Sequence, residues 1–226
     1  MSRSTDSFHP GRPTTRSART AAVAVCATAF CALLLAGCGD SDDGRSPSVS
    51  RASASPAAAT TSGLSDDQRE RAALIPADKT GYRKAVSTAV HEVPDGTVTA
   101  LELERDNKGK PVWRATVATK DGTEHEVELD AATGKVTSSR TDSDQDGDDK
   151  RDLARQLSEA KVSSQKAVDI ATGRTKGTVT SIDLDDADDG TLIWSVDIVT
   201  TDDWNKTTYD VDATNGKVVR EHVDRD

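Results

Sequence analysis

The chain contains an internal repeat, and this repeat limits the possible folds more than any other feature of the sequence. Residues 96–103 (Gly-Thr-Val-Thr-Ala-Leu-Glu-Leu) reappear as residues 177–184 (Gly-Thr-Val-Thr-Ser-Ile-Asp-Leu), a shift of 81. Further along, residues 127–136 match residues 209–218 with a shift of 82, so the intervening turn has gained one residue. With only two copies, each copy is expected to be a small domain rather than a solenoid unit.

Hydrophobic periodicity predicts a helix followed by antiparallel strands in each copy. Apolar residues recur at helical spacing in the first copy, at Tyr82, Ala85, Val86, Ala89 and Val90. In the second copy Ser163 is the predicted N-cap of the corresponding helix. After the helix the period drops to two in residues 101–104, 113–117 and 124–129, with Asp121-Gly122 as one of the hairpin turns. This alternation is typical of half-buried antiparallel strands.

A further short helix is predicted ahead of each copy. Ser65 and Gln68 form a predicted capping box at the start of the helix ahead of the first copy, and Pro76 ends this helix. Leu153 and Leu157 lie on the apolar side of the helix ahead of the second copy. The predicted fold class is α+β, with two tandem small modules. Each module is an amphipathic helix packed on a four-stranded antiparallel meander sheet. The sequence leaves open whether the two modules pack together.

Each copy resembles the PepSY domain family. In the first copy the resemblance lies in residues 84–86, 98–103, Trp113 and 127–136, which include Asp130, Thr133 and Gly134. In the second copy it lies in residues 166–168, 179–184, Trp194 and 209–218, which include Asp212, Asn215 and Gly216. The resemblance implies an exported, non-catalytic accessory domain of the kind found in propeptides of secreted peptidases and in envelope proteins. Inhibition of peptidases has been proposed for that family.

The aspartate and glycine of the shared motif are interpreted as turn residues rather than as a functional site. Asp130 is expected to accept backbone N–H groups, and Gly134 to adopt a positive φ.

The N-terminal segment resembles the signal peptide of bacterial lipoproteins. A head with four arginines precedes an apolar run over residues 21–35, and Leu35-Ala36-Gly37-Cys38 forms a lipobox. The run rises only about 22 Å as a helix, less than a bilayer core of roughly 30 Å. The resemblance implies that Cys38 receives a diacylglyceryl group and becomes the first mature residue. We therefore expect a lipid-anchored protein on the extracytoplasmic face of the cell membrane.

Charge and cysteine content exclude several classes of function. Removal of residues 1–37 takes away four arginines and one aspartate and leaves 25 basic and 38 acidic residues, a formal charge of −13. This charge argues against nucleic acid as a partner. Cys26 and Cys31 leave with the signal and Cys38 is lipidated, so we expect neither disulfides nor thiolate chemistry. No cofactor is expected, and the sequence contains neither Gly-x-Ser-x-Gly nor His-Glu-x-x-His, so an enzyme is not expected.

These features divide the chain into five predicted segments. They are the signal peptide (1–37), a flexible stalk (38–63), the first module with its preceding helix (64–140), an acidic linker (141–152) and the second module with its preceding helix (153–226).

The acidic linker contains weak calcium-ligand candidates, at Asp142, Asp144, Asp146 and Asp148. Their spacing matches the start of a calcium loop, but position 12 is Leu153 rather than the bidentate glutamate. A solvated linker explains the same residues. No metal site is assigned, because His91, His125 and His222 are also irregularly spaced.

Trp204 lies in a predicted hairpin turn, where it is either an anchor for a partner or a cover for its own strands. The resulting hypothesis is a membrane-tethered, non-catalytic binding protein that contacts a secreted peptidase or another envelope protein through an edge strand or the helix-free sheet face. The alternative is a module that binds a small ligand or calcium at the envelope.

Overall fold

The computed structural model describes residues 63–225, all of which belong to one compact unit, Ala54–Asp226. The helices are α1 (Asp66–Leu74), the 3-10 turn η1 (Ile75–Ala77), α2 (Tyr82–Glu92), α3 (Gly147–Glu159) and α4 (Ser164–Arg174). The strands are β1 (Thr97–Arg105), β2 (Pro111–Ala118), β3 (Glu124–Asp130), β4 (Val136–Thr141), β5 (Thr178–Asp186), β6 (Leu192–Val199), β7 (Lys206–Asp212) and β8 (Val218–Asp224). The predicted signal peptide, Cys38 and the stalk except Gly63 lie outside the described residues.

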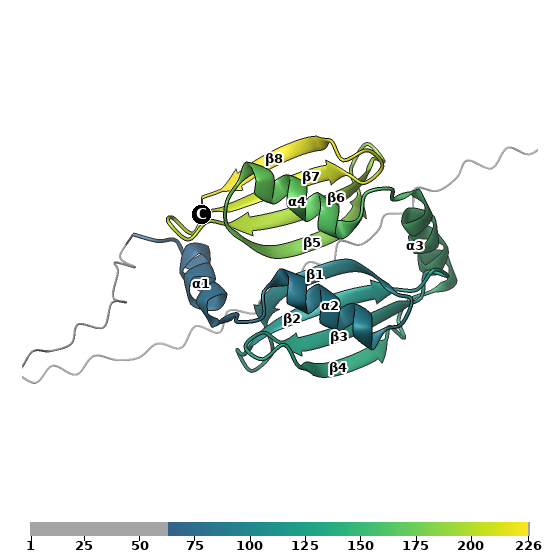
Figure 1. The fold of residues 1–226 in the computed structure, drawn as a ribbon, viewed down its shortest axis with the longest axis horizontal. Coiled ribbons are helices and arrows are strands. Elements are labelled where there is room, and N and C mark those ends of the chain that lie inside the picture. The colour runs from purple at the N-terminus through teal and green to yellow at the C-terminus, as the bar shows by residue number, and fades with distance from the viewer. Residues whose placement is uncertain (1–62, 226) are drawn as a thin grey trace, which may run out of the picture. The chain divides into compact units, whose positions relative to one another are not determined.

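Each copy folds as the α+β module that its hydrophobic pattern predicts. Helix α2 packs on β1–β3 and α4 packs on β5–β7, and both lie on the same side of the strands (Figure 1). Ser65 forms the predicted capping box with Gln68, and Ser163 accepts the backbone N–H of Lys166 at 3.3 Å. Within each copy the four strands follow one another as an antiparallel meander. Local sequence signals therefore determine both modules.

The two meanders join into one eight-stranded antiparallel sheet, a feature that the sequence leaves open. The strand order is β4-β3-β2-β1-β5-β6-β7-β8, so β1 and β5 pair at the centre. In this pairing, which we call the seam, Leu101 lies opposite Ile182, and these residues occupy equivalent positions in the repeat. The copies are thus related by an approximate two-fold axis that passes between Leu101 and Ile182.

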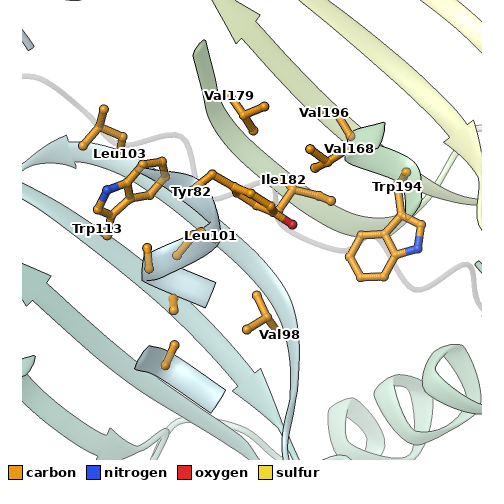
Figure 2. Packing of buried hydrophobic residues seen from close by; sticks show 14 of the residues in the cluster. Tyr82, Val98, Leu101, Leu103, Trp113, Val168, Val179, Ile182, Trp194 and Val196 are labelled. Carbon is orange, nitrogen blue, oxygen red and sulfur yellow. The ribbon is translucent and has the colours of Figure 1, made fainter. Parts of the chain in front are cut away.

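The hydrophobic core continues across the seam. Tyr82 of the first copy and Ile182 of the second, both labelled in Figure 2, belong to one buried cluster that also contains Trp113 and Trp194. On the outer side of the core, Arg83 of α2 pairs with Asp169 of α4 at 3.0 Å. Because modules of this size bury little apolar surface alone, the shared core makes the pair one folding unit.

The helix ahead of each module contacts the other module. Gln68 of α1 donates to the side chain of Asn205 at 2.9 Å, in the turn between β6 and β7. Gln145, which leads into α3, donates to the carbonyl of Gly122 at 2.7 Å, in the equivalent turn between β2 and β3. These exchanged contacts hold the copies together in addition to the seam.

The predicted linker over residues 141–152 is longer than the connection in the structure. Helix α3 begins at Gly147, inside that segment. The helix starts there because the Asp146 carboxylate accepts the N–H groups of Asp148 at 2.7 Å and Asp149 at 3.0 Å. The sequence interpretation counted these aspartates as solvated charges and missed the N-cap.

Candidate interaction surface

The sheet face opposite α2 and α4 is the candidate interaction surface. Along each strand, the side chains that alternate with core residues such as Leu101 and Ile182 point to this opposite face. One row of neighbours crosses the centre of the sheet, from Arg114 through Glu102 and Ser181 to Asp197. In Figure 1, α2 and α4 both lie over the other face of the strands. We call this surface the open face.

Every basic side chain that the strands carry on the open face is already ion-paired. These pairs are Arg114 with Glu104 (2.5 Å) and Glu128 (3.4 Å), Arg140 with Glu126, Lys206 with Asp197 (3.3 Å), and Arg220 with Asp210 (2.5 Å). Glu102 of β1 and Asp183 of β5 have no ion-pair partner among residues 63–225. The seam of the open face therefore carries two carboxylates without an ion-pair partner within this range.

A hollow of about 250 Å³ lies between these two carboxylates. Its lining includes Ala100 and Ser181, which have short side chains, and the charged residues Glu102, Arg114 and Asp183. Small-molecule and cofactor sites usually measure about 300–1,000 Å³. This seam hollow is smaller and open to solvent, so it suits the end of one long side chain better than a whole cofactor.

Both carboxylates at the seam hollow hold their protons more tightly than usual. Burial, followed by the nearby Asp185 and Glu102 charges, raises the pKa of Asp183 to about 6. Burial, followed by Glu104 and Asp197, raises the pKa of Glu102. Both residues are nonetheless exposed, so water still reaches the two carboxylates. An approaching cation would relieve this unfavourable charge.

A second depression runs along the outer side of α2. It is lined by residues of that helix and the following turn, including Lys84, Ser87 and His91. It measures about 610 Å³, and its polar side chains all come from α2. The seam hollow brings together groups from three strands and from both copies, so we take it as the candidate site.

The calcium candidates of residues 142–148 are engaged in local contacts. The Asp142 carboxylate accepts the N–H of Asp144 at 2.8 Å, Asp146 caps α3, and Asp148 pairs with Arg151. Among residues 63–225, no group of three or more histidine, cysteine or acidic side chains is arranged to hold a metal ion. Calcium binding by this segment stays a prediction of the sequence.

Trp204 folds back against its own part of the molecule, which is one of the two alternatives that the sequence leaves open. Its side chain is half-buried against the hydrophobic core, and its φ is +59°. It occupies the place of Gly122, which has a φ of +82°, in the turn that gained one residue. Its carbonyl accepts Arg71 Nη1 at 2.9 Å, so the turn also docks α1. Partner binding by Trp204 stays a prediction.

Sequence reasoning missed Glu102 and Asp183. In so acidic a chain, carboxylates are too frequent to single out. One signal could have found them: both occupy the same position of the repeat, on the polar side of the first strand. Their approach depends on the β1–β5 pairing, which the sequence does not predict.

The motif shared by the two copies is structural, as predicted. The Asp130 carboxylate accepts the N–H of Thr133 at 2.8 Å, and Gly134 has a φ of +69°. The Lys110 ammonium, followed by the Thr133 N–H, lowers the pKa of Asp130 to about 2.

The shared tryptophans also hold the modules together. Trp113 Nε1 donates to Asp78 Oδ1 at 3.1 Å, and Trp194 Nε1 donates to the Val162 carbonyl at 2.7 Å. Each bond ties the core tryptophan of a module to the segment that leads into its own helix.

Two α+β modules that share one antiparallel sheet define the class of this protein. The signature of the family described as "Peptidase propeptide and YPEB domain" matches residues 82–140 and 161–222. The chain belongs to the PepSY family. Among curated proteins it is similar to the uncharacterized protein YkoJ of Bacillus subtilis (strain 168), with 28% identity over 132 residues, which are 58% of this chain and 68% of YkoJ.

Two solved structures are also similar. One is a protein of Clostridium difficile 630 that has been proposed to be a lipoprotein, with 25% identity, a TM-score of 0.40, and coverage of 65% of this chain and 94% of that one. The other is the YpmB protein of Bacillus subtilis, with 17% identity, a TM-score of 0.28, and coverage of 62% of this chain and 96% of that one.

Proposed function

We propose that this protein is a lipid-anchored, non-catalytic binding protein of the cell envelope that modulates another exported protein, a secreted peptidase being the first candidate. The observation that carries this proposal is the open face, a polar sheet surface on the side opposite α2 and α4 within residues 63–225. The family's description as a peptidase propeptide domain supports the choice of partner.

The anchor is supported by the lipobox at residues 35–38. No helix of the described part is long and apolar enough to cross a bilayer. Acyl chains on Cys38 would supply about 0.8 kcal/mol for each buried methylene, and two or more chains make a stable anchor. Metabolic labelling with palmitate tests this directly. The native chain should be labelled and Cys38→Ala should not, and an unlabelled native chain recovered from the cytosol would contradict the anchor.

The binding role is tested with a soluble fragment, residues 54–226, which contains the whole compact unit. The immobilised fragment is incubated with secreted proteins of the source cells, and bound proteins are identified by mass spectrometry. Peptidase activity of the same material is measured with and without the fragment. We expect a specific bound protein and altered proteolysis. A fragment that retains no protein and leaves proteolysis unchanged would refute this role.

A further inference from the structure

The seam hollow carries one pair of carboxylates that the fold itself does not use. Glu102 lies opposite Ser181, and Asp183 lies opposite Ala100, so the two acidic residues are diagonal neighbours across the seam. Diagonal neighbours on antiparallel strands lie roughly 7–8 Å apart. A group placed between them can contact both carboxylates at once.

We propose that the seam hollow receives an arginine side chain of a basic, extended segment of a partner protein. This inference names the partner chemistry of the proposed binding role and rests on that role for its biological meaning. The hollow lies at the centre of the open face and is formed only when the two copies pair.

Charge complementarity identifies the occupant as cationic. The four basic side chains of the open face are already neutralised, whereas Glu102 and Asp183 are not. The raised pKa of Asp183, caused by burial and by the charge of Asp185, agrees with a shortage of positive charge around this carboxylate. A fixed positive charge between the two residues removes that shortage, whereas an anionic or neutral occupant does not.

Geometry favours arginine over other cations. A planar guanidinium has five N–H donors and can bond two acceptors in different directions, while an ammonium is a compact and strongly hydrated charge. In an extended segment, alternate side chains point to the same side. A further arginine two residues away would then reach Asp185, which follows Asp183 on the same side of β5.

The probe is a fluorescent peptide with the sequence (Thr-Arg)₃, and its affinity for fragment 54–226 is measured by fluorescence anisotropy. The test variant is Glu102→Gln with Asp183→Asn. The control variant is Asp202→Asn with Glu221→Gln, which removes two charges from exposed positions outside the hollow. Thermal melting verifies that both variants are folded.

We expect the test variant to bind the peptide at least tenfold more weakly than the native fragment, and the control variant to stay within twofold. Binding should weaken at high salt, because ion pairs are screened. Equal weakening by both variants would show non-specific attraction to an acidic protein and overturn the proposal. Absence of binding to the native fragment would also overturn it. Neither result changes the outcome of the palmitate-labelling and pull-down tests. The arginine site and the proposed binding role can therefore fail separately.

Discussion

Leu101 and Ile182 occupy equivalent positions in the two copies and lie directly opposite each other across the seam. Both side chains are almost fully buried in the core that the copies share. Because of this contact, we expect the stability of each copy to depend on the other. A substitution that weakens the core packing of one copy tests this dependence.

Leu101→Ala should destabilise both modules together. A buried leucine replaced by alanine costs about 2–5 kcal/mol. Hydrogen exchange measured by mass spectrometry should become faster in peptides from β2 and also from β6, because the core is continuous. Val136→Ala, at the partly buried outer strand β4, is the control and should have a smaller effect. Faster exchange confined to the first module would contradict a single folding unit.

Asp183→Asn should stabilise the protein at neutral pH. The pKa of the Asp183 carboxyl is about 6 in the folded chain, against 3.8 for an unperturbed aspartate. Between pH 3.8 and 6 the folded state therefore binds more protons than the unfolded state does. The stability of the native chain should therefore fall as the pH rises from about 4 to about 6, and it should stay constant above about pH 6. The full shift corresponds to about 3 kcal/mol, and because the side chain is partly exposed we expect roughly 1 kcal/mol.

The check is urea unfolding at pH 4, 5, 6 and 7. The stability gained in Asp183→Asn should grow over this range and be largest at neutral pH. Asp202→Asn, in an exposed turn, serves as the matched control. A gain that is the same at all four pH values would disprove the role of Asp183 ionisation.

Gly122→Ala should detach the segment around α3 from the first module. A Cβ on Gly122 would lie 1.9 Å from the Lys150 carbonyl oxygen, and its φ is +82°. Gly109→Ala is the control, because Gly109 has a φ of +77° but no atom within 4 Å of the added Cβ. Both variants carry the backbone strain of about 1–2 kcal/mol. Chemical denaturation should show a further loss in Gly122→Ala, at least about 1 kcal/mol beyond the control, and equal losses would contradict close docking.

Arg71 and Asp224 should be energetically coupled across the two modules. Arg71 Nη2 lies 2.7 Å from Asp224 Oδ2, and both side chains are mostly buried. A double-mutant cycle with Arg71→Ala and Asp224→Ala should give a coupling of about 1 kcal/mol. The exposed pair Arg155–Glu159 within α3 is the comparison and should give about 0.5 kcal/mol or less. A coupling no larger than in this exposed pair would mean that α1 is not held by the second module.

Local features of this fold could be predicted from the sequence because their causes are local. The capping box of Ser65 and Gln68, the apolar side of α2, the alternation in β1–β3 and the turn at Gly134 each depend on residues a few positions apart. The internal repeat in turn predicted that these local features occur twice, in two equivalent modules. The exception is Asp146, where a strong N-cap was hidden in a run of acidic residues.

The seam could not be predicted, because it depends on contacts between residues far apart in the chain. Strand β1 has one edge paired with β2, and nothing in its own sequence shows that β5 occupies the other edge. Glu102 and Asp183 acquire their shared hollow only through this pairing. The candidate site is thus a product of the duplication rather than of either copy.

The central claim is that the open face meets a partner at the seam hollow, and site-specific photo-crosslinking on intact cells tests it most directly. A photoreactive residue is placed at Thr116, which lines the hollow, or at Ser87, which is exposed on α2. The account predicts that Thr116 crosslinks to one exported protein through a basic segment and that Ser87 does not. Capture of the same protein from both positions, or of none from Thr116, would contradict it.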